Sequence, residues 1–128
     1  MRTLLDTHAL LWWLLNDSRL SSRAHGVIGD KENTILASSA SAFEIATKHR
    51  LGKLPMGSLT PVALGTAVRE ERMEILPMTF EHSLVAGGLP GPRRDPFDRM
   101  LIAQSRVEGV PVVTGDPVFL EYAVQVIW

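Results

Sequence analysis

Four acidic residues of this sequence are placed where their carboxylates could act together on one cation. Asp6 and Asp116 each follow an apolar run, whereas Glu44 and Asp98 each lie near the start of an expected helix. One carboxylate alone cannot hold a hard divalent cation, but several carboxylates with water suit Mg²⁺ or Mn²⁺. Four like charges in one cleft would also raise one another's pKa unless a cation compensated them. The chemistry indicated is metal-assisted hydrolysis of a phosphodiester bond by a bound water.

Asp98 lies in the first turn of the most clearly marked helix of the sequence. Asp95 is a good N-cap residue, Pro96 suits the first helical position, and apolar residues then recur at helical spacing. Capping explains Asp95, so the charge of Asp98 at N3 remains available for another role.

Asp6 lies between an expected strand and an expected helix. Residues 3–5 are apolar without helical period, and residues 8–15 are amphipathic. Asp6 would then stand at the carboxyl end of a strand, where open α/β sheets bind ligands. The alternative is that Asp6 or Thr7 only caps the next helix.

Glu44 lies about one turn into a helix predicted for residues 39–51, which follows a strand at 34–38. Its apolar neighbours place it near the core boundary, where an unpaired carboxylate is costly. An ordinary Glu44–Lys48 pair at i,i+4 spacing is the alternative explanation.

Asp116 follows the apolar, β-branched run 110–114, which predicts a buried strand that ends at Thr114. The acid again lies past the carboxyl end of a strand. Asp116 before Pro117 is also an ordinary turn sequence, so a purely structural role is the alternative.

The remaining elements complete an alternation of strands and helices. Expected are helices at 20–30 (capped by Ser21 or Ser22), 61–73 (capped by Thr60) and 80–86 (capped by Thr79), with strands at 74–76 and 124–128. This alternation predicts an α/β fold of three α/β/α layers with a mainly parallel central sheet. The four acids would meet at the edge where the strands end.

Three further features of the sequence have an ordinary structural explanation, and two of them also have a functional one. Trp12 and Trp13 are either core residues or part of an interface. The basic residues that end the helix at 39–51 either complement its dipole or contact phosphates. His82 has no His or Cys at ligand spacing and is expected to be an ordinary surface or boundary residue.

Composition sets limits on the fold and location. The 128 residues, 45% of them hydrophobic, suit a single domain spanning 1–128. The net charge of −1 gives no bulk basic character, so RNA binding would need a local patch. Without cysteine, any metal must bind oxygen ligands. Asp6 interrupts a signal-peptide pattern and the following Leu/Trp run is too short to span a membrane, so a cytoplasmic location is expected.

Four motifs together resemble the PIN-domain ribonucleases, in particular the VapC toxins of type II toxin–antitoxin systems, over essentially the whole chain. They are Leu5-Asp6-Thr7-His8, Phe43-Glu44-Ile45 with Lys48 and Leu51-Gly52-Lys53-Leu54, Arg94-Asp95-Pro96-Phe97-Asp98-Arg99, and Val113-Thr114-Gly115-Asp116. The resemblance implies a PIN fold, Mg²⁺- or Mn²⁺-dependent cleavage of RNA, a homodimer, and inhibition by a VapB-type antitoxin.

The resemblance also implies roles for individual residues. Asp6, Glu44, Asp98 and Asp116 would be the catalytic metal ligands, Thr114 would support them, Asp95 and Thr7 would cap or assist, and Lys48, Arg94 and Arg99 would contact the substrate. Arg94 departs from the family, since close relatives often carry histidine there, and residues 87–92 are rich in glycine and proline. Neither departure removes a metal ligand.

Two other functions compete with the ribonuclease. A receiver-like or haloacid-dehalogenase-like phosphotransfer domain also has an acid after its first strand, but residues 6–8 lack the second nearby acid that those sites use. A catalytically silent PIN-like module would use the acidic cleft only to bind a basic partner segment or RNA. The presence of all four acids favours the enzyme.

Overall fold

A five-stranded parallel sheet forms the centre of the computed structural model, which describes residues 1–91 and 93–128. The strand order is β3-β2-β1-β4-β5, and each neighbouring pair is parallel. The strands are β1 (Arg2–Leu5), β2 (Thr34–Ser38), β3 (Glu74–Leu76), β4 (Val112–Val113) and β5 (Val126–Ile127). The predicted mainly parallel sheet is confirmed.

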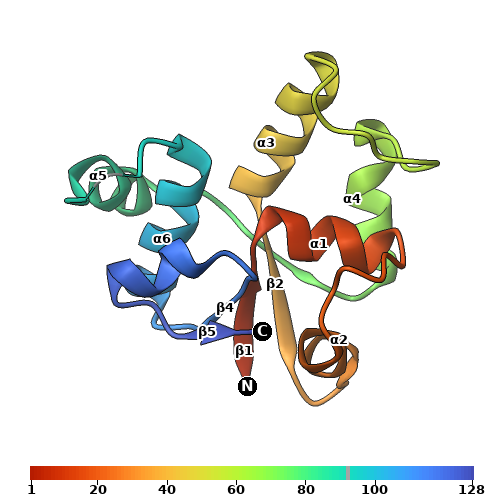
Figure 1. The fold of residues 1–128 in the computed structure, drawn as a ribbon, viewed down its shortest axis with the longest axis horizontal. Helices are drawn as coiled ribbons and strands as arrows, with labels where there is room; N and C mark the ends of the chain where they lie inside the picture. Colours follow the sequence, from red (N-terminus) through yellow and green to blue (C-terminus); the bar gives the residue numbers. More distant parts are fainter. Residues whose placement is uncertain (92) are drawn as a thin grey trace.

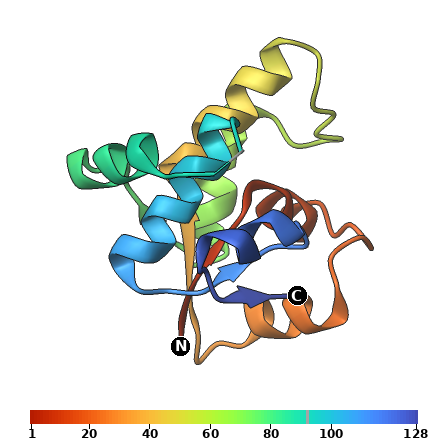
Figure 2. The same ribbon diagram turned by 60° about the vertical axis from the view of Figure 1, so that its left-hand side comes forward.

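Helices cover both faces of this sheet. They are α1 (Thr7–Leu14), α2 (Ser22–Gly29), α3 (Ser39–Arg50), α4 (Pro61–Glu70), α5 (Phe80–Gly88), α6 (Pro96–Glu108) and a 3₁₀ helix, η1 (Pro117–Tyr122). Figure 1 shows α5 and α6 on one side of the strands and α1, α2 and α4 on the other. Figure 2 shows α3 and the segment after it extending from the top of the molecule. This arrangement is the three-layer α/β/α fold that the sequence predicts.

The sheet is buried from both sides because its strands alternate their side chains between two cores. Leu4 and Leu36 pack in a cluster with Leu101 of α6. Their neighbours Leu5 and Ala37 belong to a second cluster, which includes residues of α1, α2 and α4. A strand buried on both faces reads as a continuous apolar run, as these strands do.

The predicted caps are confirmed where helices begin. Asp95 is the N-cap of α6, and its Oδ1 accepts from the backbone N–H groups of Phe97 and Asp98 at 2.8 and 3.1 Å. Ser21, Thr60 and Thr79 cap α2, α4 and α5 in the same way. These caps fix where the helices begin relative to the strand ends.

Several predicted elements are shorter in the structure, among them the strand expected at 124–128, which is reduced to Val126–Ile127. The helix expected at 61–73 ends at Glu70, because Arg72 adopts a left-handed backbone conformation (φ 59°) before the chain enters β3. The strand expected at 110–114 is reduced to Val112–Val113, although the carbonyl of Pro111 still accepts from Leu4 N–H at 2.9 Å. Pro111 has no N–H for the ladder, which limits regular pairing there.

His82 is buried, so the expectation of a surface or boundary histidine was wrong. Its Nδ1 accepts from the backbone N–H of Thr79 at 3.0 Å, and Nε2 lies 3.3 Å from a carboxylate oxygen of Glu108. His82 therefore completes a capping box at the start of α5, a role usually taken by Glu or Gln.

Trp12 and Trp13 are both partly buried against the core beneath α1, as the core-packing alternative predicts. Among the described residues, no helix is long and apolar enough to cross a membrane.

Candidate active site

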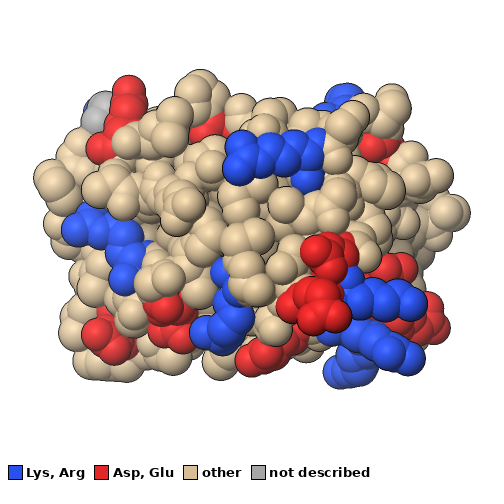
Figure 3. Space-filling model, turned by 90° about the horizontal axis from the view of Figure 1, so that it is seen from below, with Lys and Arg blue, Asp and Glu red and all other residues tan. Residues whose placement is uncertain are grey.

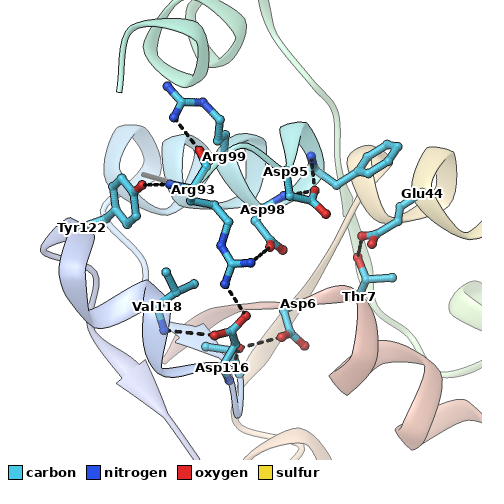
Figure 4. A network of polar contacts seen from close by, with 12 residues as sticks. Asp6, Thr7, Glu44, Arg93, Asp95, Asp98, Arg99, Asp116, Val118 and Tyr122 are labelled. Atoms are coloured by element: carbon cyan, nitrogen blue, oxygen red, sulfur yellow. Dashed lines mark hydrogen bonds and ion pairs between the residues drawn. The ribbon is translucent and has the colours of Figure 1, made fainter. Parts of the chain in front are cut away.

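The carboxyl edge of the central strands gathers the acidic side chains. β1 lies between β2 and β4 in the sheet. The strands β2 and β3 lie on one side of β1, whereas the later strands β4 and β5 lie on the other, so the boundary between β1 and β4 is a topological switch point. Asp6 follows β1 and Asp116 follows β4. In Figure 4, Asp6, Asp98 and Asp116 face a shared space, with Asp95 and Glu44 beside it.

Asp6 combines the two roles considered for it. Its Oδ1 caps α1 by accepting from Ala9 N–H at 2.8 Å, and its Oδ2 accepts from the Thr114 hydroxyl at 2.6 Å. Burial raises the pKa of Asp6, although the hydrogen bonds from Thr114 and Ala9 oppose this shift. Thr114, itself fully buried, thus orients the carboxylate at the strand end.

Glu44 is only 4% exposed and is held at the side of the shared space. Its Oε1 accepts from the Thr7 hydroxyl at 2.6 Å, and its Oε2 pairs with Lys48. The i,i+4 pair considered as an alternative is therefore present. The Lys48 ammonium also lies 5.9 Å from the ring centre of Phe97.

The pKa of Asp98 is also raised, and by a large amount. Burial and the nearby charge of Asp95 raise its pKa to about 7, with smaller contributions from Glu44 and Asp116, while Arg93 opposes the shift. Besides burial, the neighbouring carboxylates contribute to this raised pKa, which indicates that the acids share one electrostatic environment. Perturbed groups of this kind are concentrated at functional sites.

Arg93 places a cation among these carboxylates, a feature that the sequence prediction missed. One guanidinium nitrogen donates to Asp116 Oδ2 at 3.0 Å, and another lies 3.6 Å from Asp98 Oδ2. Its Nε is buried and has no hydrogen-bond partner among the described residues. The backbone N–H of Arg93 donates to the Tyr122 hydroxyl at 3.1 Å, as Figure 4 shows.

The donor set suits a hard cation, although the present arrangement does not enclose one. Among the described residues, no three acidic or histidine side chains are close enough to hold a single ion. The available donors are carboxylate oxygens, which Mg²⁺ and Mn²⁺ prefer, and a positive group already lies between two of them. Withdrawal of Arg93 would leave Asp98 and Asp116 without this counter-charge.

Arg99 has a different environment from the substrate contact predicted for it. Its guanidinium donates to the carbonyl oxygens of Ala86, Arg93 and Leu89 at 3.0, 3.0 and 2.5 Å, and lies 3.5 Å from that of Gly87. Figure 4 shows it directed away from the acids. Arg99 therefore positions the backbone between α5 and α6, including Arg93. A contact between Arg99 and the substrate stays a prediction.

The other predicted substrate contacts differ in accessibility. Arg94 is exposed, whereas Lys48 is engaged with Glu44. Figure 3 views the molecule from below Figure 1, at the end of the sheet opposite the acids, and shows cationic and anionic side chains interspersed there. That face gives no extended basic surface, in keeping with the net charge of −1.

Comparison with known families decides what kind of domain carries this site. The sequence model of the PIN domain matches residues 3–125, nearly the whole chain. The chain belongs to the PIN-domain family. Curated proteins give no match to this PIN domain.

Solved structures share the fold. VapC20 of Mycobacterium tuberculosis, described as a toxin that cleaves the sarcin-ricin loop, superposes with a TM-score of 0.67 at 16% identity, covering 95% of each chain. VapBC2 of Rickettsia felis, bound to a DNA fragment from its promoter, gives 0.63 at 16% identity, covering 98% of this chain and 97% of the other. FitAcB of Neisseria gonorrhoeae gives 0.63 at 18% identity, covering 97% and 95%. At these identities the likeness establishes the PIN fold.

Proposed function

We propose that this PIN domain is a Mg²⁺- or Mn²⁺-dependent endoribonuclease that acts as the toxin of a VapBC-type toxin–antitoxin system. The observation that carries the proposal is the position of Asp6, Asp98 and Asp116 around one space at the switch point of the sheet. Such a position is where α/β sheets bind ligands. The fold that the chain shares with VapC20, described as a toxin that cleaves the sarcin-ricin loop, supports the same function.

Each residue of the site would have a distinct task. Asp6, Asp98 and Asp116, with Glu44 at the side, would hold the cation, and Thr114 would keep the Asp6 carboxylate oriented through their 2.6 Å hydrogen bond. The bound cation would supply Lewis-acid activation of a water and stabilise the leaving oxygen of the phosphodiester. Thr7 would orient Glu44 in the same way that Thr114 orients Asp6.

The proposal includes a separate VapB-type antitoxin and a homodimer, with a cytoplasmic location. The solved VapBC2 structure, bound to DNA from its promoter, supports the antitoxin. Large exposed apolar side chains support protein contacts, notably Val62 at 95%, Phe80 at 82% and Leu84 at 65% exposure. Co-purification from cells that express both chains, followed by light scattering, would measure partner and stoichiometry.

A catalytically silent PIN-like binding module is the second candidate. The observation that favours it is Arg93, which already supplies a positive group to Asp98 and Asp116, as a basic partner segment would. The two candidates differ in what the protein does to RNA.

Incubation of antitoxin-free protein with a pool of cellular RNA, in Mn²⁺ or in EDTA, separates the two candidates. Discrete fragments that form only with Mn²⁺ are expected for the ribonuclease. A folded protein that binds Mn²⁺ or RNA but leaves the RNA intact would support the silent module.

Arg93→Gln is expected to tighten Mn²⁺ binding about fivefold, measured by isothermal titration calorimetry. The substitution removes ion pairs that the metal must otherwise displace, and a partly exposed pair contributes up to about 1 kcal/mol. The exposed neighbour Arg94 provides the matched control, since Arg94→Gln should leave the affinity unchanged. Equal or weaker Mn²⁺ binding by Arg93→Gln would contradict the expectation that Arg93 and the metal compete for Asp98 and Asp116.

Asp95→Asn is expected to retain substantial RNA cleavage, within about tenfold of the wild type, because asparagine caps a helix nearly as well as aspartate. Both N–H groups that Asp95 accepts from would still have a side-chain oxygen. Cleavage rates at saturating Mn²⁺ measure the effect. Complete loss of cleavage by a folded variant would instead make Asp95 a metal ligand.

A further inference from the structure

A cavity of about 440 Å³ adjoins the acidic site, and Asp6 and Asp116 form part of its wall. The rest of the wall is largely aromatic or cationic, from His8, Trp12, Arg19 and Trp128. Its volume lies within the range of about 300–1,000 Å³ that is usual for small-ligand pockets. The cavity therefore lies directly beside the position at which the proposed function cleaves a phosphodiester.

The aromatic part of this wall is assembled from separate segments of the chain. The Trp12 ring of α1 lies 5.5 Å from His8 and 5.9 Å from Trp128, which follows β5. The Arg19 guanidinium lies 5.0 Å from the centre of the Trp12 ring and also pairs with Asp17. His8 is exposed, and both indoles are only partly buried, so the cluster is not fully used in packing the core.

Gly115 allows the Trp128 indole to lie close to the end of β4. A Cβ at this position would lie 2.9 Å from Trp128 Cε2, too close for an unstrained contact. The absence of a side chain therefore permits an aromatic wall immediately next to Asp116. The same short segment thus connects an acid of the proposed metal site to a stacking surface.

We propose that this cavity binds the nucleobase adjacent to the cleaved phosphate, which stacks against Trp128 and Trp12. The inference rests on the proposed ribonuclease function and extends it to the substrate. Aromatic side chains stack with any base of an unpaired strand, whereas bases within a duplex are not accessible. Arg19, with 69% of its side chain exposed, supplies hydrogen-bond donors for the sugar or phosphate of the same segment. The substrate class is accordingly single-stranded RNA with an unstacked base beside the cleavage site.

Trp128→Leu and Trp128→Phe test this stacking. After the cleavage site is mapped, a short oligoribonucleotide spanning it is prepared intact and with an abasic nucleotide at either neighbouring position. Dissociation constants are measured in EDTA by fluorescence anisotropy, so that cleavage does not interfere. Trp13→Leu is the matched control, because Trp13 lies on the same helix but lines a different cavity.

The expected result is a loss of affinity on the order of tenfold for Trp128→Leu with the intact oligoribonucleotide. Trp128→Phe should recover most of this affinity. The oligoribonucleotide that lacks the stacked base should bind the wild type more weakly than the intact one, and Trp128→Leu should bind this abasic RNA with the same affinity as the wild type. Trp13→Leu should bind like the wild type. The comparison of intact and abasic RNA by wild-type protein remains decisive even if Trp128→Leu fails to fold.

Equal binding of intact and abasic RNA by the wild type would overturn the subsite, and is the result expected if the cavity receives a side chain of a protein partner. Where metal-dependent cleavage is still observed, the ribonuclease function stands and only the subsite is wrong. A wild-type protein that neither binds nor cleaves RNA would overturn both.

Discussion

Asp98→Asn is expected to lower metal-dependent RNA cleavage by about 10³-fold or more. The substitution keeps the shape of the side chain but removes a negative charge from the group that would hold the cation. Loss of several kcal/mol of metal-supplied stabilisation of the transition state corresponds to a rate change of this size. Single-turnover cleavage rates of wild type and variant, at equal Mn²⁺ concentration, measure the effect.

Stability provides the control for this variant, and its pH dependence has a definite sign. The pKa of Asp98 is raised from 3.8 to about 7 in the folded protein, mainly by burial and Asp95. Protonated Asp98 therefore contributes to the free energy of unfolding in full below about pH 4, and this contribution is lost as the pH rises through 7, because the buried carboxyl group must then ionise. Asparagine does not titrate, so metal-free Asp98→Asn should gain stability relative to the wild type between these pH values.

Thermal unfolding in EDTA across this pH range, followed by circular dichroism, checks that gain. A variant that is folded and inactive supports the role of Asp98. An Asp98→Asn protein with wild-type, metal-dependent cleavage would remove Asp98 from the metal site.

Arg99→Met is expected to reduce the free energy of unfolding by about 2–4 kcal/mol. Arg99 donates to carbonyl oxygens of α5 and of the segment that connects α5 to α6, and hydrogen bonds to a charged group contribute about 1.5–3 kcal/mol each when buried. The full sum does not apply, because the side chain is partly exposed. Methionine preserves the packing of the aliphatic stem.

Chemical denaturation measures this loss, with Arg106→Met as the matched control on the same helix. Arg106 is exposed, so its substitution should change stability by less than about 0.5 kcal/mol. Equal stability of the two variants, together with weaker RNA binding by Arg99→Met, would favour a substrate contact for Arg99 over this structural role.

Much of the fold could be predicted because its signals are local. The Asp95-Pro96 pair marks the start of α6, and Gly109, with a left-handed backbone, marks its end. The apolar run at β2 gives its bounds directly, since a buried parallel strand needs apolar residues on both faces. The chain order and the alternation of elements then lead to a parallel sheet.

The candidate site was only partly predictable, because local sequence patterns do not show which residues from distant parts of the chain come into contact. The acids follow strand ends or begin helices, and this places them at one edge. The roles of Arg93 and Arg99 depend on the path of the chain between α5 and α6, for which periodicity gives no signal. Likewise, His82 is buried where α5 packs against α6, which brings its Nε2 within 3.3 Å of Glu108, 26 residues away.

Anomalous X-ray scattering from crystals soaked in Mn²⁺ would show directly whether these carboxylates bind the catalytic metal. We expect a Mn²⁺ peak in contact with Asp6, Asp98 and Asp116, with the Arg93 guanidinium displaced from its present position. The contradicting result is active, metal-dependent protein whose crystals show no Mn²⁺ at these residues, or show it bound elsewhere.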